Sequence, residues 1–431
     1  MSVRNLQFLF EPRSVAVIGA TENARHIGAI VLRNLIAGGF RGSILPVNPK
    51  YDTIAGLKNY RRIADLPQVP ELALICTPPR TVAAIVGELG AIGTKAVIVH
   101  SGMVEIAGGQ HGSLTLRMLH AAAPYLLRIL GPDSVGLQVP QIGLNASIAP
   151  ASALPGSIAF VSQSGALANV VLDWAGSRGI GFSRFVTLGQ CADIDVADVL
   201  DYLARDACTK SILLYVEQIG HARKFMSAAR AAARSKPTLV VRAGGRSAGD
   251  DVYDAAIRRA GMLRLQSTEE LFGAVETLAW ARSAQGERLS IVTNGGGLGA
   301  MAAHALVAAG GSLVALSDET QARLQQALPA GWSGDNPLDI ADNAAAESYV
   351  EVMRVLLQEP ESDAILFIHA PSALVASADI ARAIVPLAQQ TSRNILTCWP
   401  GGALAEPARQ PGSAEALGAW AWELPASLPA Q

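Results

Sequence analysis

The chain alternates short runs of apolar residues with longer segments in which apolar and polar residues are mixed. In the first part of the chain the apolar runs are Val15–Ile18, Ile44–Val47, Leu72–Ile75 and Ala96–Val99. Longer segments such as Gly28–Ala37 and Thr81–Leu89 lie between them and are expected to be helices. Runs of this length suit strands that are buried on both faces. The order strand, helix, strand then predicts an α/β fold with a doubly wound parallel sheet.

The same alternation continues in two further blocks. The second block has predicted strands at Ile158–Val161, Phe185–Leu188, Ile212–Val216 and Thr238–Val241. The third has predicted strands at Ser290–Thr293, Leu313–Leu316, Ala364–His369 and Ile395–Cys398. We therefore expect domains at residues 1–130, 150–282 and 286–400. The last segment, 401–431, is rich in Ala, Pro and Gly and loses this alternation, so we expect an irregular tail there.

The second and third blocks open on similar sequences. Residues 160–167 read FVSQSGAL and residues 291–298 read IVTNGGGL, so small residues directly follow an apolar run in both. This similarity predicts two related folds that use the same turn between a strand and a helix.

Composition and charge narrow the class of protein. The 431 residues include 34 basic and 36 acidic side chains, which gives a net charge of -2 and no electrostatic reason to expect nucleic acid or an anionic membrane as partner. The four cysteines have neither the spacing of a metal site nor the density of a disulfide scaffold. No signal peptide is recognisable at the start of the chain, so we expect a cytoplasmic protein.

One stretch, Asn294–Ser317, carries no formal charge and is long enough to cross a membrane. Its glycines and the central His304 instead favour a strand, a tight turn, a buried helix and a second strand.

Candidate ligand-binding residues follow the predicted strands of the first block. The first strand leads into Gly19-Ala20-Thr21, and this turn is either a pyrophosphate-binding loop or a purely structural turn. The second strand leads into Asn48-Pro49-Lys50, where a lysine suits a ribose phosphate better than the free hydroxyl of NAD. The residues that follow the next two strands are Thr77, Pro78 and Ser101. All of them are expected at the carboxyl edge of the sheet, where open α/β sheets bind ligands, unless Pro and Gly merely end the strands.

Together with these turns, an ordered series of motifs resembles the NDP-forming acyl-CoA synthetases, which are relatives of succinyl-CoA ligase. The motifs are Gly131–Gly136, Leu144–Ala146, Ser162–Leu167, Leu188-Gly189, Leu214–Glu217, Lys236-Pro237, Gly245–Ser247, Tyr253–Ala256 and Asn336–Asp339. The resemblance runs from about Leu6 to Cys398. It implies a Rossmann-type CoA-binding domain followed by two flavodoxin-like domains of the succinyl-CoA synthetase type.

The resemblance also implies two kinds of binding residue. The implied contacts with CoA are Gly19, Ala20, Thr21, Asn48, Pro49, Lys50, Thr77, Pro78 and Ser101. The residues implied to aim helix N-termini at a phosphohistidine are Ser162, Ser164, Gly165, Ala166, Asn294, Gly295, Gly296 and Gly297. Unpaired amides and a helix dipole suit phosphate, although close packing of a helix on a sheet also requires glycine.

Two departures from that family bear on its chemistry. Active members carry a phosphoryl-accepting histidine between the Gly-Arg-Ser and Tyr-Asp-Ala-Ala motifs, whereas residues 245–253 here read GRSAGDDVY and contain no histidine. The nearest histidine, His221, is expected to be a surface loop residue. Glu217 matches the glutamate that contacts the family's histidine, and without that imidazole no catalytic residue is assigned. The ATP-grasp domain is also missing from this chain.

A subgroup of the family lacks the same histidine: the synthetase-like region of bacterial protein lysine acetyltransferases. The motifs that resemble it are Asp195-Val196, Asp201–Asp206, Arg259–Arg264 and Val275–Leu278. This resemblance implies a catalytically incomplete module that senses CoA or acetyl-CoA and works with a GNAT acetyltransferase domain.

Two other functions remain open. The chain is alternatively the α-type component of an ADP-forming acetate or acyl-CoA ligase, which would use ATP and ADP only through a separate ATP-grasp partner. An NAD oxidoreductase is disfavoured, because the first turn is not G-x-G-x-x-G. A homo-oligomer is compatible with each of these functions.

Weaker candidates lie at other strand ends. Asp193, Asp195 and Asp198 either bind Mg²⁺ or cap a helix, and the cap is favoured. His100 and His369 are expected to be hydrogen-bonded structural residues. Cys191 has no neighbouring basic residue in the sequence that would favour a thiolate.

Overall fold

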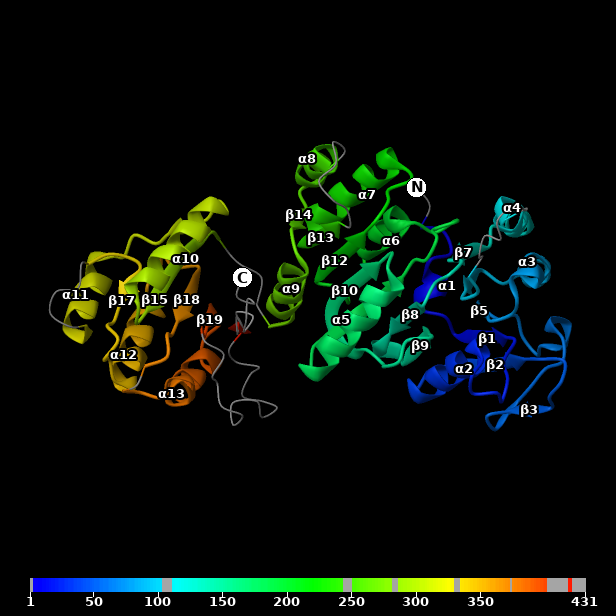
Figure 1. Ribbon diagram of the computed structural model, residues 1–431, viewed down its shortest axis with the longest axis horizontal. Helices are drawn as coiled ribbons and strands as arrows, with labels where there is room; N and C mark the ends of the chain where they lie inside the picture. The colour runs from blue at the N-terminus through cyan, green and yellow to red at the C-terminus, as the bar shows by residue number, and fades with distance from the viewer. Residues whose placement is uncertain are drawn as a thin grey trace, which may run out of the picture. The chain divides into compact units, whose positions relative to one another are not determined.

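The computed structural model describes residues 3–102, 111–242, 250–280, 286–328, 334–372, 374–400 and 418–420. It divides into two compact units, Met1–Val275 and Glu276–Gln431, which are treated separately below. Among the described residues, the first unit holds two large sheets and one two-stranded sheet, and the second unit holds one sheet (Figure 1).

The first sheet is parallel and has the order β2 (Ser43–Val47), β1 (Ser14–Ile18), β5 (Leu72–Ile75), β6 (Ala96–Val99) and β7 (Arg128–Leu130). Its helices are α2 (Ile27–Ala37), α3 (Pro79–Ile92) and α4 (His111–Ala122). Alternate strand residues face two separate cores, so Val15 packs with α2 and Ala16 packs with α3 and α4. The four predicted strands are confirmed to within one residue.

Smaller elements complete this part of the chain. They are α1 (Gln7–Phe10), β3 (Thr53–Ile54), β4 (Leu57–Lys58) and the short 3-10 helices Ile63–Asp65, Ala123–Tyr125 and Pro140–Ile142. Helix α1 lies against the second sheet's helix α6, where Phe10 stacks on Tyr202 at 4.4 Å between ring centroids.

The second sheet has seven strands. Four of its five parallel strands correspond to the second predicted block, and the fifth, Leu263–Leu265, was not predicted. Its order is β14 (Leu263–Leu265), β13 (Thr238–Arg242), β12 (Ser211–Val216), β10 (Leu154–Ser162), β11 (Gly181–Thr187), β8 (Gly136–Val139) and β9 (Leu144–Ser147). Its helices are α5 (Gly165–Ser177), α6 (Val196–Leu203), α7 (Ala222–Ser235), α8 (Asp250–Ala260) and α9 (Thr268–Trp280).

Two further features of the second sheet differ from the sequence-based expectation. Strand β11 begins at Gly181 and ends at Thr187, so the predicted strand Phe185–Leu188 began four residues too late and ended one residue too late. The antiparallel pair β8 and β9 was not predicted, because polar residues interrupt both strands. This pair joins the first two sheets, since Asn34 Nδ2 on α2 donates to the carbonyls of Ser147 at 2.9 Å and Ala149 at 3.0 Å.

The third sheet forms the core of the second unit. Its order is β16 (Ser312–Leu313), β15 (Arg288–Thr293), β18 (Ala364–Ile368), β19 (Asn394–Cys398) and β20 (Gly418–Trp420), and β17 (Leu338–Asp339) also pairs with β15. Its helices are α10 (Gly296–Ala308), α11 (Asp318–Ala327), α12 (Ala346–Leu356) and α13 (Ser377–Gln389).

The predicted strand Leu313–Leu316 is wrong beyond its first residue. Strand β16 pairs with the start of β15, and β17 pairs with Val292 and Thr293 at the end of β15. A longer β16 would need the position beside β15 that β17 occupies. The Asn336 side chain donates to the Val314 carbonyl at 3.2 Å instead. Val314 and Leu316 remain buried as core residues.

The expected irregular tail is wrong at Gly418–Trp420, which pair in parallel with β19 as strand β20. The other residues of 401–431 lie outside the described part of the chain. The uncharged stretch Asn294–Ser317 forms α10, a turn and β16, which confirms the predicted helix and second strand. The expectation of a buried helix is wrong, because Gly299 is the one buried residue that the structure describes in α10. Among the described residues, no helix combines the length and apolar character that crossing a membrane requires.

Candidate functional site

The loops at the carboxyl edge of the first sheet are joined by hydrogen bonds. Gly19 N donates to the Val47 carbonyl at 3.0 Å, and Asn48 Nδ2 donates to the Ala20 carbonyl at 2.7 Å. The strand order reverses here, because β2 lies on one side of β1 and β5 lies on the other. Open α/β sheets bind nucleotides at such a reversal.

Two positions around the turn after β1 accept only glycine: Gly19 in the turn itself and Gly28 at the start of α2. Gly19 has a φ of +89°, and a Cβ there would lie 2.9 Å from Thr77 Cγ2. A Cβ on Gly28, at the start of α2, would lie 2.0 Å from the Gly19 carbonyl oxygen. No side chain caps the N-terminus of α2. The turn is therefore tight, as both sequence-based interpretations require, and it leaves the first amides of α2 without a side-chain partner.

Lys50 lies in an ordered loop after β2, but its own side chain is exposed. The Lys50 amide donates to Asn48 Oδ1 at 2.9 Å, and Asn59 Nδ2 donates to the Asn48 carbonyl at 2.8 Å. Thr21 and Tyr51 share a hydrogen bond of 3.2 Å between their hydroxyls. Lys50 makes no ion pair with any described residue, so its ammonium group is available to a ligand.

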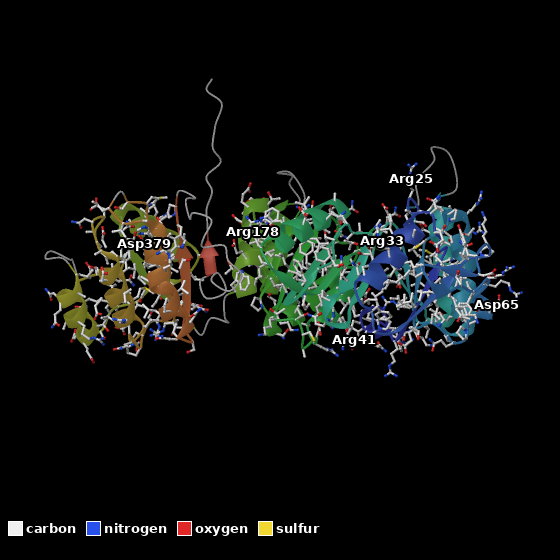
Figure 2. The ribbon with its side chains drawn as sticks, turned by 90° about the horizontal axis from the view of Figure 1, so that it is seen from below. Arg25, Arg33, Arg41, Asp65, Arg178 and Asp379 are labelled. Carbon is white, nitrogen blue, oxygen red and sulfur yellow. The ribbon has the colours of Figure 1, made fainter. Side chains whose placement is uncertain are left out.

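The remaining predicted CoA contacts continue the same edge. The Ser101 hydroxyl donates to the Thr77 carbonyl, and Thr81 Oγ1 donates to Thr77 Oγ1 at 2.9 Å. Pro78 is the N-cap residue of α3. Ser101 is buried, and its hydrogen bond to Thr77 joins the end of β6 to the end of β5. Arg25, in the loop before α2, projects outward from the ribbon (Figure 2). All nine predicted CoA contacts thus lie in loops on one edge of the sheet.

A second group of residues lies at the carboxyl edge of the second sheet. The Gln163 side-chain oxygen accepts from the amides of Glu217 at 2.6 Å and Gln218 at 2.9 Å. Gln163 Nε2 donates to the Gln218 carbonyl at 3.0 Å and to Cys191 Sγ at 3.5 Å. One amide side chain therefore connects the loops that follow β10, β11 and β12.

These loops enclose a cleft of about 850 Å³. The polar side chains along its wall include Asp133, Gln163, Asn169, Cys191, Asp193, Asp195, Glu217 and His221, and Gly165 and Ala166 at the start of α5 also line it. Ser164 caps helix α5 by accepting from the Leu167 amide at 3.3 Å. Ser162 Oγ accepts from the Ser164 amide at 3.0 Å. The predicted phosphate-binding residues of this block therefore form a capped helix N-terminus beside the cleft.

The third sheet repeats this arrangement within the second unit. Thr293 Oγ1 accepts from the Gly295 amide at 3.0 Å, as Ser162 does for Ser164. Asn294 Oδ1 accepts from the Ala370 amide at 2.7 Å, as Gln163 does for Glu217. Gly295 is the N-cap residue of α10, which begins with Gly296 and Gly297. The predicted repeat therefore extends to matching side-chain hydrogen bonds, although the position of Glu217 is occupied by Ala370.

The two strand-end histidines are structural residues, as expected. His100 Nδ1 lies 3.0 Å from the Ser134 carbonyl oxygen, and burial lowers the pKa of its imidazole to about 4. His369 Nδ1 lies 3.0 Å from the Tyr349 hydroxyl, and burial lowers the pKa of His369 as well. Burial also raises the pKa of Tyr349 to about 12. Both imidazoles are therefore neutral near pH 7.

The three aspartates after β11 take part in ion pairs and a helix cap. Asp193 pairs with Arg128 at 2.9 Å. Asp195 and Asp198 form a capping box at the start of α6, and Lys224 pairs with both, at 3.0 Å and 2.6 Å. No cluster of three metal-ligating side chains occurs among the described residues. The favoured capping role is confirmed for Asp195 and Asp198, whereas Asp193 forms an ion pair instead.

Cys191 lines the cleft in a left-handed backbone conformation with a φ of +52°. Burial raises the pKa of its thiol, and the carboxylates of Asp195 and Glu217 act in the same direction. The hydrogen bond from Gln163 acts against them. The thiol therefore stays protonated near pH 7, in line with the sequence-based expectation.

His221 is exposed at the N-cap position of α7, but it also lines the cleft. The expectation of a surface loop residue is therefore confirmed, but it did not include the cleft that His221 shares with Gly165. No local pattern marks this proximity, since β11 and β12 separate the two residues along the chain. The Gly245–Ser247 motif lies outside the described residues.

Family models match two parts of the chain. Residues 13–140 match a CoA binding domain, and residues 155–278 match a succinyl-CoA ligase like flavodoxin domain. These matches confirm the predicted fold class. The suggested relationship to protein lysine acetyltransferases stays a prediction.

Curated relatives extend the similarity over most of the chain. The chain is 34% identical over 411 residues to acetate–CoA ligase [ADP-forming] I of Archaeoglobus fulgidus, and this match covers 92% of the chain and 58% of the relative. It is also 34% identical over 400 residues to the α subunit of acetate–CoA ligase [ADP-forming] I of Pyrococcus furiosus, and this match covers 88% of the chain and 86% of the relative.

A solved structure that is similar to this chain is the dinucleotide-forming acetyl-coenzyme A synthetase 1 of Ca. Korarchaeum cryptofilum in complex with phosphate and ADP. It is 30% identical to this chain with a TM-score of 0.87, and the match covers 96% of this chain and 93% of that one.

Proposed function

This chain belongs to the family of ADP-forming acetate–CoA ligases, and from that premise we propose that it is the α-type, CoA-binding component of an ADP-forming acyl-CoA ligase. The observation that carries the proposal is the convergence of four loops on the carboxyl edge of the first sheet. These loops contain Gly19, Asn48, Thr77 and Ser101, and hydrogen bonds and close packing join them to one another.

The carboxyl edge of the first sheet supplies groups that can bind the phosphates of a nucleotide thioester. Backbone amides around Gly19 and at the start of α2 suit the pyrophosphate. The exposed ammonium group of Lys50 suits a phosphate on the ribose, which CoA carries and NAD lacks. The cleft beside Gly165 would then receive the phosphoryl group that is exchanged with the acyl group, because a helix N-terminus stabilises an anion.

A partner polypeptide would complete the ligase. The Pyrococcus relative is named as an α subunit, which supports a second, nucleotide-binding component for this chain as well. By the family resemblance that component is an ATP-grasp domain, so ATP and ADP would act through the partner. Acetate is the acid in the names of these relatives, and we propose a small carboxylic acid as the substrate class.

A second candidate function is acyl-CoA sensing without ligase turnover, as in the resemblance to protein lysine acetyltransferases with a GNAT partner. One observation favours it: residues 243–252 contain no histidine, although the family's phosphoryl acceptor belongs in this segment. The two candidates share the CoA site and differ in whether phosphate is transferred.

Calorimetric titration with CoA, acetyl-CoA and NAD tests the shared site. We expect CoA and acetyl-CoA to bind and NAD to give no heat. Lys50→Glu should weaken CoA binding at least about tenfold, because it replaces one charge-assisted contact by repulsion. Lys210 is an exposed lysine at the amino edge of the second sheet, opposite that sheet's carboxyl edge. Lys210→Glu should therefore leave CoA binding unchanged. Binding of NAD in place of CoA would overturn the proposal.

Synthesis of acetyl-CoA distinguishes the two candidates. The chain is mixed with acetate, ATP, Mg²⁺, CoA and an ATP-grasp subunit encoded by the same genome, and release of ADP with acetyl-CoA is followed. Turnover supports the ligase component. CoA binding without turnover favours the sensor.

A further inference from the structure

We propose that His221 is the phosphoryl acceptor of this chain and takes the role of the imidazole that is absent from residues 243–252. This inference rests on the proposed ligase function. It follows from the cleft at the edge of the second sheet, where an imidazole, a carboxylate and a capped helix N-terminus line the same space.

The loop that carries His221 is fixed at its start. It leaves β12 at Glu217, whose amide is held by Gln163 at 2.6 Å, and it ends where His221 caps α7. The His221 carbonyl accepts from the Phe225 amide at 2.9 Å. The imidazole itself makes no hydrogen bond or ion pair with the described residues, so its ring nitrogens are available for reaction.

One wall of the cleft that His221 lines is suited to a phosphoryl group. Gly165 and Ala166 open helix α5 and bring the positive end of its dipole to the wall of the cleft. Asn169, one turn further along α5, also lines the cleft, and its side-chain oxygen is buried with no hydrogen-bond partner among the described residues. An amide oxygen only accepts, so this atom suits a ligand group that donates a hydrogen bond, such as the hydroxyl of a protonated phosphate or a bound water, since buried polar atoms are normally paired.

The carboxylates of the cleft are partly compensated by cations. Asp193 pairs with Arg128 and Asp195 pairs with Lys224, but Asp198 shares both of these cations. Asp133 and Glu217 make no ion pair with a described residue. Glu217 lies four residues before His221 on the same loop and suits the acceptor of a proton from the imidazole.

The other histidines are worse placed for this role. His100 and His369 are buried and hydrogen-bonded. His26 and His120 are exposed in the first sheet's part of the chain, and neither lines the cleft. His304 lies in the second unit, and the side chain of His111 lies outside the described residues.

His221 is also reachable from a second side. A neighbouring cavity of about 1060 Å³ shares Gly220 and His221 with the cleft, and its wall includes Arg4 and Arg223. A phosphoryl carrier has to meet two reaction partners in turn, the acyl phosphate and the nucleotide site of the partner subunit. A position between two cavities provides that access.

The proposed step is nucleophilic substitution at phosphorus. An unprotonated imidazole nitrogen of His221 attacks the phosphorus of an acyl phosphate, the bond from phosphorus to the acyl oxygen breaks, and the carboxylate leaves with the bonding electron pair. The new bond joins phosphorus to nitrogen, and the proton on the other ring nitrogen passes to Glu217 or water. No oxidant or reductant is involved.

Labelling with acetyl phosphate that carries radioactive phosphorus tests the proposal. We expect acid-labile, alkali-stable phosphate on the full chain, located at His221 by mass spectrometry. His221→Asn should abolish the label, and His120→Asn, an exposed histidine on α4, should keep it. Circular dichroism and CoA titration of each variant show that the fold and the CoA site are intact.

The outcomes separate this inference from the function on which it rests. If CoA binds and no acid-labile phosphate forms, the assignment of His221 is overturned and the CoA site stands. Label that survives in His221→Asn overturns the assignment too, because another residue is then the acceptor. Failure of both CoA binding and labelling removes the proposed function itself.

Discussion

The Gln163 side-chain oxygen accepts a hydrogen bond of 2.6 Å from the backbone amide of Glu217, so the residue that follows β10 holds the loop that follows β12. Asn294 holds Ala370 in the same way in the third sheet, at 2.7 Å. A repeated fold therefore fixes its ligand-binding edge by a repeated side-chain contact.

Gln163→Met tests the importance of that contact. Methionine has a similar length but offers no strong acceptor, so the amides of Glu217 and Gln218 lose their partner. We expect a loss of about 1–2 kcal/mol in the free energy of unfolding, measured with urea. Gln68→Met, at an exposed glutamine, should leave the urea midpoint unchanged. An equal loss in both variants would contradict a specific role for Gln163.

Gly19→Ala should damage both the fold and the CoA site. The left-handed backbone at a φ of +89° disfavours alanine, and the added methyl group would approach Thr77 Cγ2 to 2.9 Å. We expect a loss of about 1–3 kcal/mol in stability and weaker CoA binding by calorimetry.

Gly39→Ala is the matched control for that change. Gly39 has a φ of +73°, and no atom lies within 4 Å of the position of an added Cβ. Its loss should be about 1 kcal/mol, with CoA binding retained. The prediction for Gly19 fails if the two variants behave alike.

The buried His100 predicts a specific dependence of stability on pH. The folded chain keeps this imidazole neutral down to about pH 4, whereas in the unfolded chain it binds a proton near its ordinary pKa of 6.5. Stability from this group is therefore fully present above pH 6.5 and is lost as pH falls toward 4. The loss should reach up to about 3 kcal/mol.

Urea unfolding at a series of pH values measures this effect. His100→Asn should flatten the decline of the wild type between pH 6.5 and 4, while His120→Asn, an exposed histidine, should follow the wild type. Parallel curves for the wild type and His100→Asn would show that His100 does not titrate as inferred. His369, whose pKa is also lowered, contributes to both curves alike.

Lys224→Met should destabilise the chain, because it leaves Arg128 as the remaining ion-pair partner of the buried Asp198 carboxylate among the described residues. We expect a loss of about 1–3 kcal/mol, less than for a fully buried pair since the Lys224 side chain is 25% exposed. Thermal unfolding measures it, with Lys210→Met at an exposed position as the control. A wild-type melting temperature in Lys224→Met would contradict the structural role of this ion pair.

The amino-acid sequence alone predicted the features that depend on local pattern. Apolar runs such as Val15–Ile18 and Leu72–Ile75 are strands because a parallel strand buried on both faces needs an uninterrupted run. The match between residues 160–167 and 291–298 predicted the repeat, and the structure adds its hydrogen bonds. The turns after the strands were also predictable, because parallel strands bring their carboxyl ends to one edge.

Only the tertiary structure decided the features that depend on partners distant in the chain. The pair β8 and β9 carries polar residues and is a strand pair because it bridges β11 and α2. Strand β17 pairs with β15 and so ends β16 early. His221 reaches the cleft of Gly165 because β10 and β12 are neighbours in the sheet. Hydrophobic periodicity is set by the nearest residues, whereas the partner of a polar side chain is set by which strands lie side by side.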